Sequence, residues 1–133
     1  ISRGRLSLNI VTGGRPTEQA MYGDYLDHDA RYRRTREFMQ ICRQLWLNNI
    51  AFDFDGEFHQ LKGSKLETLP LQPGGPKFYF GGASDMAQQV GAELSDVYLM
   101  WAETFEQIEA RIQKMRLLIK ACGREKLVRY GVR

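Results

Sequence analysis

Apolar and polar residues alternate in the first segment of the chain. Residues 5–12 place aliphatic side chains on one face and mostly polar ones on the other: Leu6, Leu8 and Ile10 against Ser7, Asn9 and Val11. A period of two residues predicts a β-strand. Short apolar runs predict three more strands, at 77–82, 96–101 and 127–133.

Between these strands the apolar residues recur every three or four positions, which predicts amphipathic helices at 28–47, 84–95 and 104–122. The residues at the helix ends agree with these limits. The expected N-caps are Asp27 or Asp29 for the first helix, Ser84 for the second, and Thr104 with Gln107 as a capping box for the third. Gly123 fits the position that follows the end of the third helix.

A hairpin at about 51–63 interrupts this alternation, with Asp55-Gly56 as an expected two-residue turn. Elsewhere strands and helices alternate, which predicts parallel strands covered by helices, in an open doubly wound sheet or in part of a barrel. The strands of a doubly wound sheet are covered by helices on both faces and are nearly continuously apolar, whereas residues 5–12 have one mostly polar face, and this favours a barrel. A complete barrel needs about 250 residues. The 133 residues therefore predict an α/β fold that is a partial (β/α)8 TIM barrel of about four strands.

A partial barrel has consequences for association. It leaves two strand edges unpaired, and we expect it to present inner-face residues such as Phe78 or Phe80 to solvent. The isolated chain is therefore expected to self-associate, and the protein to form a homo-oligomer.

Composition narrows the class of protein. The apolar fraction is 43% and the charged fraction 26%, which are ordinary for a soluble globular domain. No apolar run approaches the roughly 18 residues of a membrane span, and we recognise no secretory signal. Cys42 and Cys122 lie far apart on apolar helix stripes, where we expect small buried side chains in a reducing cytoplasm.

Charge and histidine content argue against two further classes. The net charge is +3, and the only dense basic cluster, at 31–36, directly follows three aspartates that would cancel much of its field. We therefore expect a solvated helix face and no nucleic-acid partner. His28 and His59 have no partner at metal-ligand spacing, so no metal is expected, and His59 is expected at the surface.

Candidate functional residues lie where the predicted strands end, because the carboxyl ends of barrel strands carry the active site. Asn9 either contacts a ligand or is an inward-facing polar residue whose hydrogen bonds are satisfied by the neighbouring backbone. The turn Gly81–Ser84 offers N–H groups to a phosphate, or Ser84 only caps its helix. Trp101 lines a ligand or belongs to the core, and Arg133 binds an anion or is frayed. These residues alone do not specify an enzyme.

Four segments together resemble a known family: SRGRLSLNIVTGGRP, LDHDARYRRTREF, KFYFGGASDMAQQVGAELSDVYLMWAE and YGVR. Their order and spacing are similar to those of alkanesulfonate monooxygenases, in the bacterial luciferase-like group of flavin-dependent enzymes. The resemblance covers essentially the whole chain and places residues 1–133 from the fourth to the seventh barrel strand, as one fragment.

The resemblance implies a two-component monooxygenase. Such an enzyme receives reduced FMN (FMNH2) from a separate NAD(P)H-dependent FMN reductase and, with O2, converts an alkanesulfonate to an aldehyde and sulfite. Two alternatives stay open: a non-catalytic half-barrel that associates with itself or a partner, and a related flavin- or deazaflavin-dependent oxidoreductase with another substrate.

The resemblance also assigns roles to individual residues. It implies that the flavin is approached by Asn9, Val11 and Thr12, and its phosphate by Tyr32, Gly82, Ala83 and Ser84. Arg133 matches an active-site arginine that contacts the sulfonate or the flavin. Ala83 departs from the family's Gly-Gly-Ser-Ser turn and removes one hydroxyl. The family's histidine would lie two positions beyond Arg133, so we expect the isolated chain to be inactive.

Overall fold

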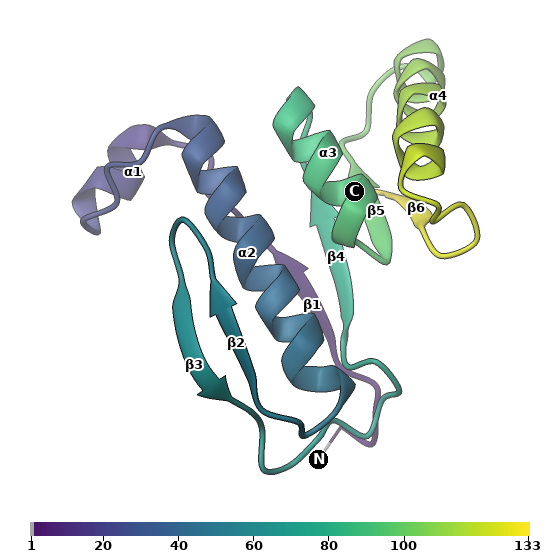
Figure 1. The fold of residues 1–133 in the computed structure, drawn as a ribbon. Helices are drawn as coiled ribbons and strands as arrows, with labels where there is room; N and C mark the ends of the chain where they lie inside the picture. The colour runs from purple at the N-terminus through teal and green to yellow at the C-terminus, as the bar shows by residue number, and fades with distance from the viewer. Residues whose placement is uncertain (1) are drawn as a thin grey trace. The chain divides into compact units, whose positions relative to one another are not determined.

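The computed structural model describes residues 2–133, which form two compact units. Among these residues, unit 1 comprises residues 2–6 and Thr12–Pro76, and unit 2 comprises Ser7–Val11 and Lys77–Arg133. Figure 1 shows the helices and strands of both units, which are described separately below.

Unit 2 contains a four-stranded parallel sheet in the order β1-β4-β5-β6. The strands are β1 (Ser7–Ile10), β4 (Lys77–Gly81), β5 (Val97–Met100) and β6 (Arg129–Val132). Helices α3 (Asp85–Leu94) and α4 (Phe105–Ala121) connect consecutive strands. The predicted α/β class, the parallel pairing and the helices predicted at 84–95 and 104–122 are thus confirmed, and the sheet with its helices is part of a (β/α)8 barrel.

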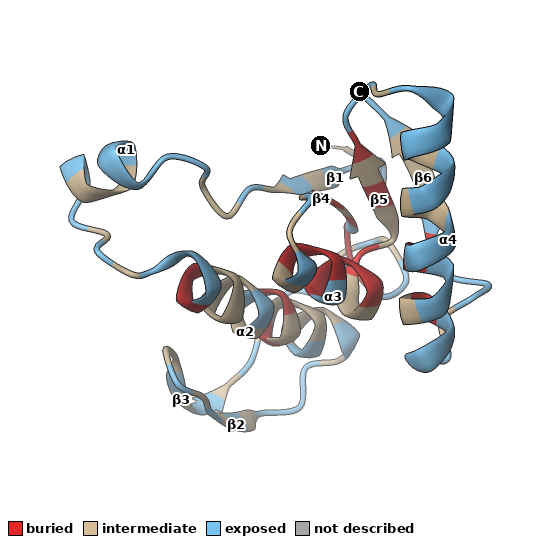
Figure 2. Ribbon diagram, turned by 90° about the horizontal axis from the view of Figure 1, so that it is seen from above, coloured by how far each residue is buried: buried red, intermediate tan, exposed pale blue. Residues whose placement is uncertain are grey.

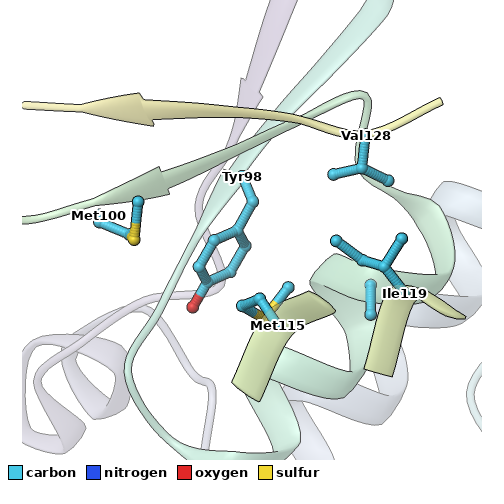
Figure 3. Packing of buried hydrophobic residues seen from close by; sticks show 6 residues of the cluster. Tyr98, Met100, Met115, Ile119 and Val128 are labelled. Atoms are coloured by element: carbon cyan, nitrogen blue, oxygen red, sulfur yellow. The ribbon is translucent and has the colours of Figure 1, made fainter. Parts of the chain in front are cut away.

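The core of unit 2 lies between the sheet and its two helices. Figure 3 shows Tyr98 of β5 extending from the sheet toward Met115 and Ile119 of α4, with Val128 beside them. Tyr98 and Met115 are fully buried. In Figure 2 the buried residues of this unit gather on α3 and the central strands, whereas most of α4 is exposed.

The structure corrects the expected orientation of β4. Phe78 and Phe80 are completely buried, so they do not line an open inner face. The register pairs Phe80 with Tyr98, which belongs to the core beside α4, so both residues lie on the helix-covered face of the sheet. The opposite face of β4 carries Tyr79 and Gly81, which are half-buried.

The ends of α3 and α4 explain why these helices begin and stop where they do. The Ser84 hydroxyl accepts from the backbone N–H of Ala87 at 3.3 Å, as predicted for an N-cap. Thr104 and Gln107 form the predicted capping box of α4. Gly123 follows this helix with φ +66°, a conformation that glycine adopts without steric cost.

Unit 1 contains a helical segment that sequence patterning missed and a long helix that it found. The missed segment is α1 (Pro16–Met21), in a stretch expected to be loop; Pro16 at its first position suits a helix start. The long helix is α2 (His28–Leu47), and of the two possible N-caps the structure selects Asp27, whose carboxylate accepts from Ala30 N at 2.8 Å.

The hairpin of unit 1 consists of β2 (Phe52–Asp55) and β3 (Gln60–Ser64), an antiparallel pair that ends one residue beyond the predicted 51–63. Its connection is not the expected two-residue turn. Asp55 pairs with Gln60, so residues 56–59 form a four-residue loop, closed by a hydrogen bond from Gly56 N to His59 O.

Glu37 of α2 explains this longer loop. Its carboxylate accepts hydrogen bonds from the backbone N–H groups of Glu57 (2.6 Å), Phe58 (3.0 Å) and His59 (3.0 Å), and its Oε2 lies 3.1 Å from His59 Nδ1. A Cβ added to Gly56 would lie 2.6 Å from this carboxylate, so the close approach requires glycine. His59 is therefore half-buried against α2, which corrects its expected place at the surface.

The structure also corrects the expected burial of two cysteines and one arginine. Cys42 is only half-buried and Cys122 is exposed, so neither is a buried core residue. Arg31, expected on a solvated face, is buried and donates to the carbonyl of Leu26 at 2.9 Å.

Among residues 2–133, no helix is long and apolar enough to cross a membrane, and no group of residues has the composition of a metal site.

Candidate functional site

The carboxyl ends of all four strands of unit 2 lie along one edge of its sheet, because the strands are parallel. This edge carries six of the eight predicted site residues: Asn9, Val11, Gly82, Ala83, Ser84 and Arg133. Asn9 lies in β1 opposite Tyr79 and is exposed, on the face away from α3 and α4. Val11 follows the end of β1 and is also exposed.

The two remaining predicted residues belong to unit 1. Thr12 donates from its hydroxyl to that of Thr35 on α2 at 3.1 Å, and Tyr32 lies one turn earlier on the same helix. The Tyr32 ring packs against the ring of His28 with 4.8 Å between centroids. Thr12 and Tyr32 are therefore associated with the N-terminal half of α2.

Arg133 at the end of β6 is held by both its backbone and its side chain. Its N–H donates to Met100 O at 2.9 Å, and its carbonyl accepts from Ala102 N at 3.1 Å, so its backbone is not frayed. The guanidinium lies 4.2 Å from the ring centroid of Trp101, a cation–π contact worth about 0.5–1 kcal/mol at an exposed site. Of the two expectations for Trp101, core or ligand wall, the structure excludes the core, because Trp101 is 57% exposed.

The turn between β4 and α3 is the best-defined part of the site. Among the described residues, the amides of Ala83 and Ser84 have no recorded hydrogen-bond partner, and the turn leads directly into α3. Amides at a helix start carry partial positive charge and bind anions. Ser84 caps α3, yet its hydroxyl keeps its own hydrogen to donate. Capping and anion binding, the two alternatives for this residue, are thus compatible.

Charge beside this turn is balanced by a neighbouring helix. Asp85, the first residue of α3, would repel an anion bound at the turn. Lys114 of α4 lies 2.6 Å from its carboxylate, and this hydrogen bond lowers the pKa of Asp85. The pairing offsets the negative charge at the start of α3.

Two residues that sequence patterning missed hold the carbonyl groups of the same turn. The hydroxyl of Tyr98 donates to Gly82 O, and the side-chain amide of Gln88 donates to Ala83 O at 2.6 Å. Tyr98 is fully buried and Gln88 is 5% exposed. The sequence held one signal for the contact of Gln88: it lies four residues after the N-cap, where a helical side chain points back toward the preceding turn.

Burial of the Gln88 side chain is energetically unfavourable. Its Oε1 is buried without a hydrogen-bond partner in the described structure, and such a group costs about 1–3 kcal/mol. The opposite orientation of the amide would place Oε1 against the Ala83 carbonyl, an unfavourable contact between two acceptors. The hydrogen bond to the turn is thus the polar interaction that the Gln88 side chain makes.

The model of one protein family matches the whole chain, residues 1–133: the luciferase-like monooxygenases. This chain belongs to that family. The luciferase-like group expected from the sequence is confirmed, whereas the match does not distinguish its alkanesulfonate-specific members.

Solved structures with the same fold support the assignment of the architecture. A riboflavin lyase with modified FMN and riboflavin is 21% identical with a TM-score of 0.88, over 98% of this chain and 34% of its own. An EDTA monooxygenase from Chelativorans sp. BNC1 is 22% identical with a TM-score of 0.82, over 98% and 36%. An F420-dependent secondary alcohol dehydrogenase is 19% identical with a TM-score of 0.82, over 97% and 39%. This luciferase-like chain therefore spans little more than a third of the length of such structures.

Proposed function

We propose that this chain is the phosphate-binding part of an FMNH2-dependent monooxygenase that desulfonates alkanesulfonates in the cytoplasm. The observation that carries the proposal is the turn Gly82–Ser84, in which the amides of Ala83 and Ser84 are uncommitted at the start of α3. Membership of the luciferase-like monooxygenases supports the reaction class. The sulfonate substrate rests on the sequence resemblance.

The residues present fit a flavin phosphate. The amides of Ala83 and Ser84 and the Ser84 hydroxyl supply hydrogen-bond donors for phosphate oxygens, and hydrogen bonds to a charged group are worth about 1.5–3 kcal/mol each. In the proposal, Tyr32 adds a hydroxyl to the phosphate, and Asn9, Val11 and Thr12 approach the ring. Arg133 attracts the anionic sulfonate or the flavin, because its guanidinium stays charged at any physiological pH.

Reduced FMN supplies two electrons for the reaction with O2. One oxygen atom enters the aldehyde, the C–S bond breaks to release sulfite, and the second oxygen atom leaves as water. The chain's own residues bind and orient the reactants in this scheme. A separate NAD(P)H-dependent FMN reductase supplies the reduced flavin, and the full-length protein is a homo-oligomer.

The test places a negative charge on the turn of the full-length protein. We expect Ser84→Asp to weaken binding of reduced FMN, titrated anaerobically, by tenfold or more, which corresponds to about 1.4 kcal/mol. Ser84→Asn is the matched control, because asparagine has nearly the same shape, caps helices well and is neutral. If both variants fold and bind reduced FMN with the affinity of the wild type, the phosphate lies elsewhere and the assignment of this turn is wrong.

A further inference from the structure

Two carbonyl groups of the turn Gly82–Ser84 are held by side chains. Tyr98 reaches Gly82 O from strand β5, and Gln88 reaches Ala83 O at 2.6 Å from the first turns of α3. Both donors are side chains from the buried side of the turn, and both are at least nine-tenths buried themselves. Two consecutive carbonyls are thus fixed toward the protein interior.

Because the peptide group is planar, fixing these two carbonyl groups also fixes the direction of two N–H groups. The peptide bonds of the described residues are all trans, and in a planar trans peptide the C=O and the following N–H point in opposite directions. The Gly82 carbonyl shares its peptide group with the amide of Ala83, and the Ala83 carbonyl shares its own with the amide of Ser84. Both amides therefore point away from Tyr98 and Gln88, on the open side of the turn.

We propose that Tyr98 and Gln88 are positioning residues that hold the amides of Ala83 and Ser84 ready for a phosphate. This inference rests on the proposed function. It explains why an amide side chain is kept at position 88 although its Oε1 is buried without a hydrogen-bond partner in the described structure. It also gives a role to the hydroxyl of Tyr98, whose ring is otherwise surrounded by the apolar core of Figure 3.

A fixed turn affects affinity through entropy. A free turn must lose conformational freedom when it orders around the phosphate, whereas a turn held by two buried side chains has already lost it. The phosphate then gains from both amides without that ordering cost. The rest of the ligand is unaffected, so the effect is specific to the phosphate group.

The experiment compares FMN with riboflavin, which lacks the phosphate, on Tyr98→Phe and Gln88→Met of the full-length protein. Reduced forms of both ligands are titrated anaerobically. We expect each variant to lose fivefold or more in affinity for FMN while its affinity for riboflavin changes less than twofold. A purely structural role would not move the ratio of the two dissociation constants.

Matched controls are available for both substitutions. Tyr130 lies opposite Tyr98 on the neighbouring strand, so Tyr130→Phe removes a similar hydroxyl that does not bond to the turn. Gln89 is the exposed neighbour of Gln88, and its amide donates to Glu93 at 3.4 Å. Gln89→Met therefore removes an amide that donates to Glu93 and not to the turn. Both controls should keep the wild-type preference for FMN.

The outcomes separate this inference from the proposed function. If the wild type prefers FMN and both variants keep that preference, Tyr98 and Gln88 do not position the turn, and the phosphate assignment stands. If a variant loses both ligands in parallel, its residue has only a structural role. If the wild type binds FMN no better than riboflavin, the phosphate assignment itself is wrong, and the positioning role with it.

Discussion

The side chain of Glu37 makes a dense set of polar contacts in unit 1. Three consecutive backbone N–H groups and the His59 ring surround its carboxylate. Partial burial raises the pKa of Glu37, but the hydrogen bonds from His59 and from the backbone of residues 57–59 outweigh it and hold the pKa below its usual value. The charged form is therefore favoured in the folded state.

We expect Glu37→Gln to lower the free energy of unfolding by about 1–3 kcal/mol, because several hydrogen bonds lose a charged acceptor. Urea denaturation measures this. Arg33→Gln is the control: it breaks the exposed ion pair between Arg33 and Glu57, which contributes little to stability because solvent screens it. Equal effects of the two substitutions would contradict the central role of Glu37.

The lowered pKa of Glu37 also gives the sign of a pH effect. A carboxyl whose pKa is lower in the folded state adds stability above its usual pKa of about 4.3, and this contribution is lost as the pH falls through the folded value. The difference in unfolding free energy between wild type and Glu37→Gln should therefore shrink in acid. A difference that stays constant from neutral pH down to acid would refute the mechanism.

At the scale of secondary-structure elements, Arg124 connects the turn after α4 to the end of α3. Its guanidinium donates to Ala92 O at 2.7 Å and to Ser95 O at 2.9 Å, two carbonyls at the end of that helix. Carbonyls at a helix C-terminus lack partners within the helix and carry partial negative charge. Arg124 thus satisfies groups that α3 cannot satisfy itself.

We expect Arg124→Met to destabilise the protein by about 1–3 kcal/mol through the loss of these charge-assisted hydrogen bonds. Thermal denaturation monitored by circular dichroism is a suitable measurement. Lys126→Met, an exposed position in the same connection, removes the same charge and should change stability by less than about 0.5 kcal/mol. The prediction fails if Arg124→Met melts at the wild-type temperature.

Elements with a strong periodic pattern were predictable from the sequence, and elements set by distant contacts were not. The stripe of α4 and its capping box are local signals, and the helix lies where they placed it. The four-residue hairpin loop depends on Glu37, nearly twenty positions earlier in the chain, so Asp55-Gly56 alone suggested a shorter turn. In the same way Ser84 was found by its capping pattern, whereas the contact of Tyr98 with the turn is tertiary.

At the scale of the whole molecule, association follows from the sheet of unit 2. β1 and β6 are its edge strands, and Val132 of β6 is 55% exposed. Edge strands with exposed apolar side chains pair with other chains. We expect the isolated 133-residue chain to sediment at micromolar concentration as species larger than a monomer. A single monomeric boundary in sedimentation velocity would contradict this expectation.

The chain has two tryptophans, and they belong to different units: Trp46 to unit 1 and Trp101 to unit 2. Each unit thus contains its own intrinsic fluorophore. In a Trp46→Phe protein the remaining emission comes from Trp101, beside the guanidinium of Arg133. Its intensity then reports changes at the strand ends, whereas in a Trp101→Phe protein the emission of Trp46 follows the melting of unit 1. Two single-tryptophan proteins can therefore distinguish optically whether the units unfold in one step or in two.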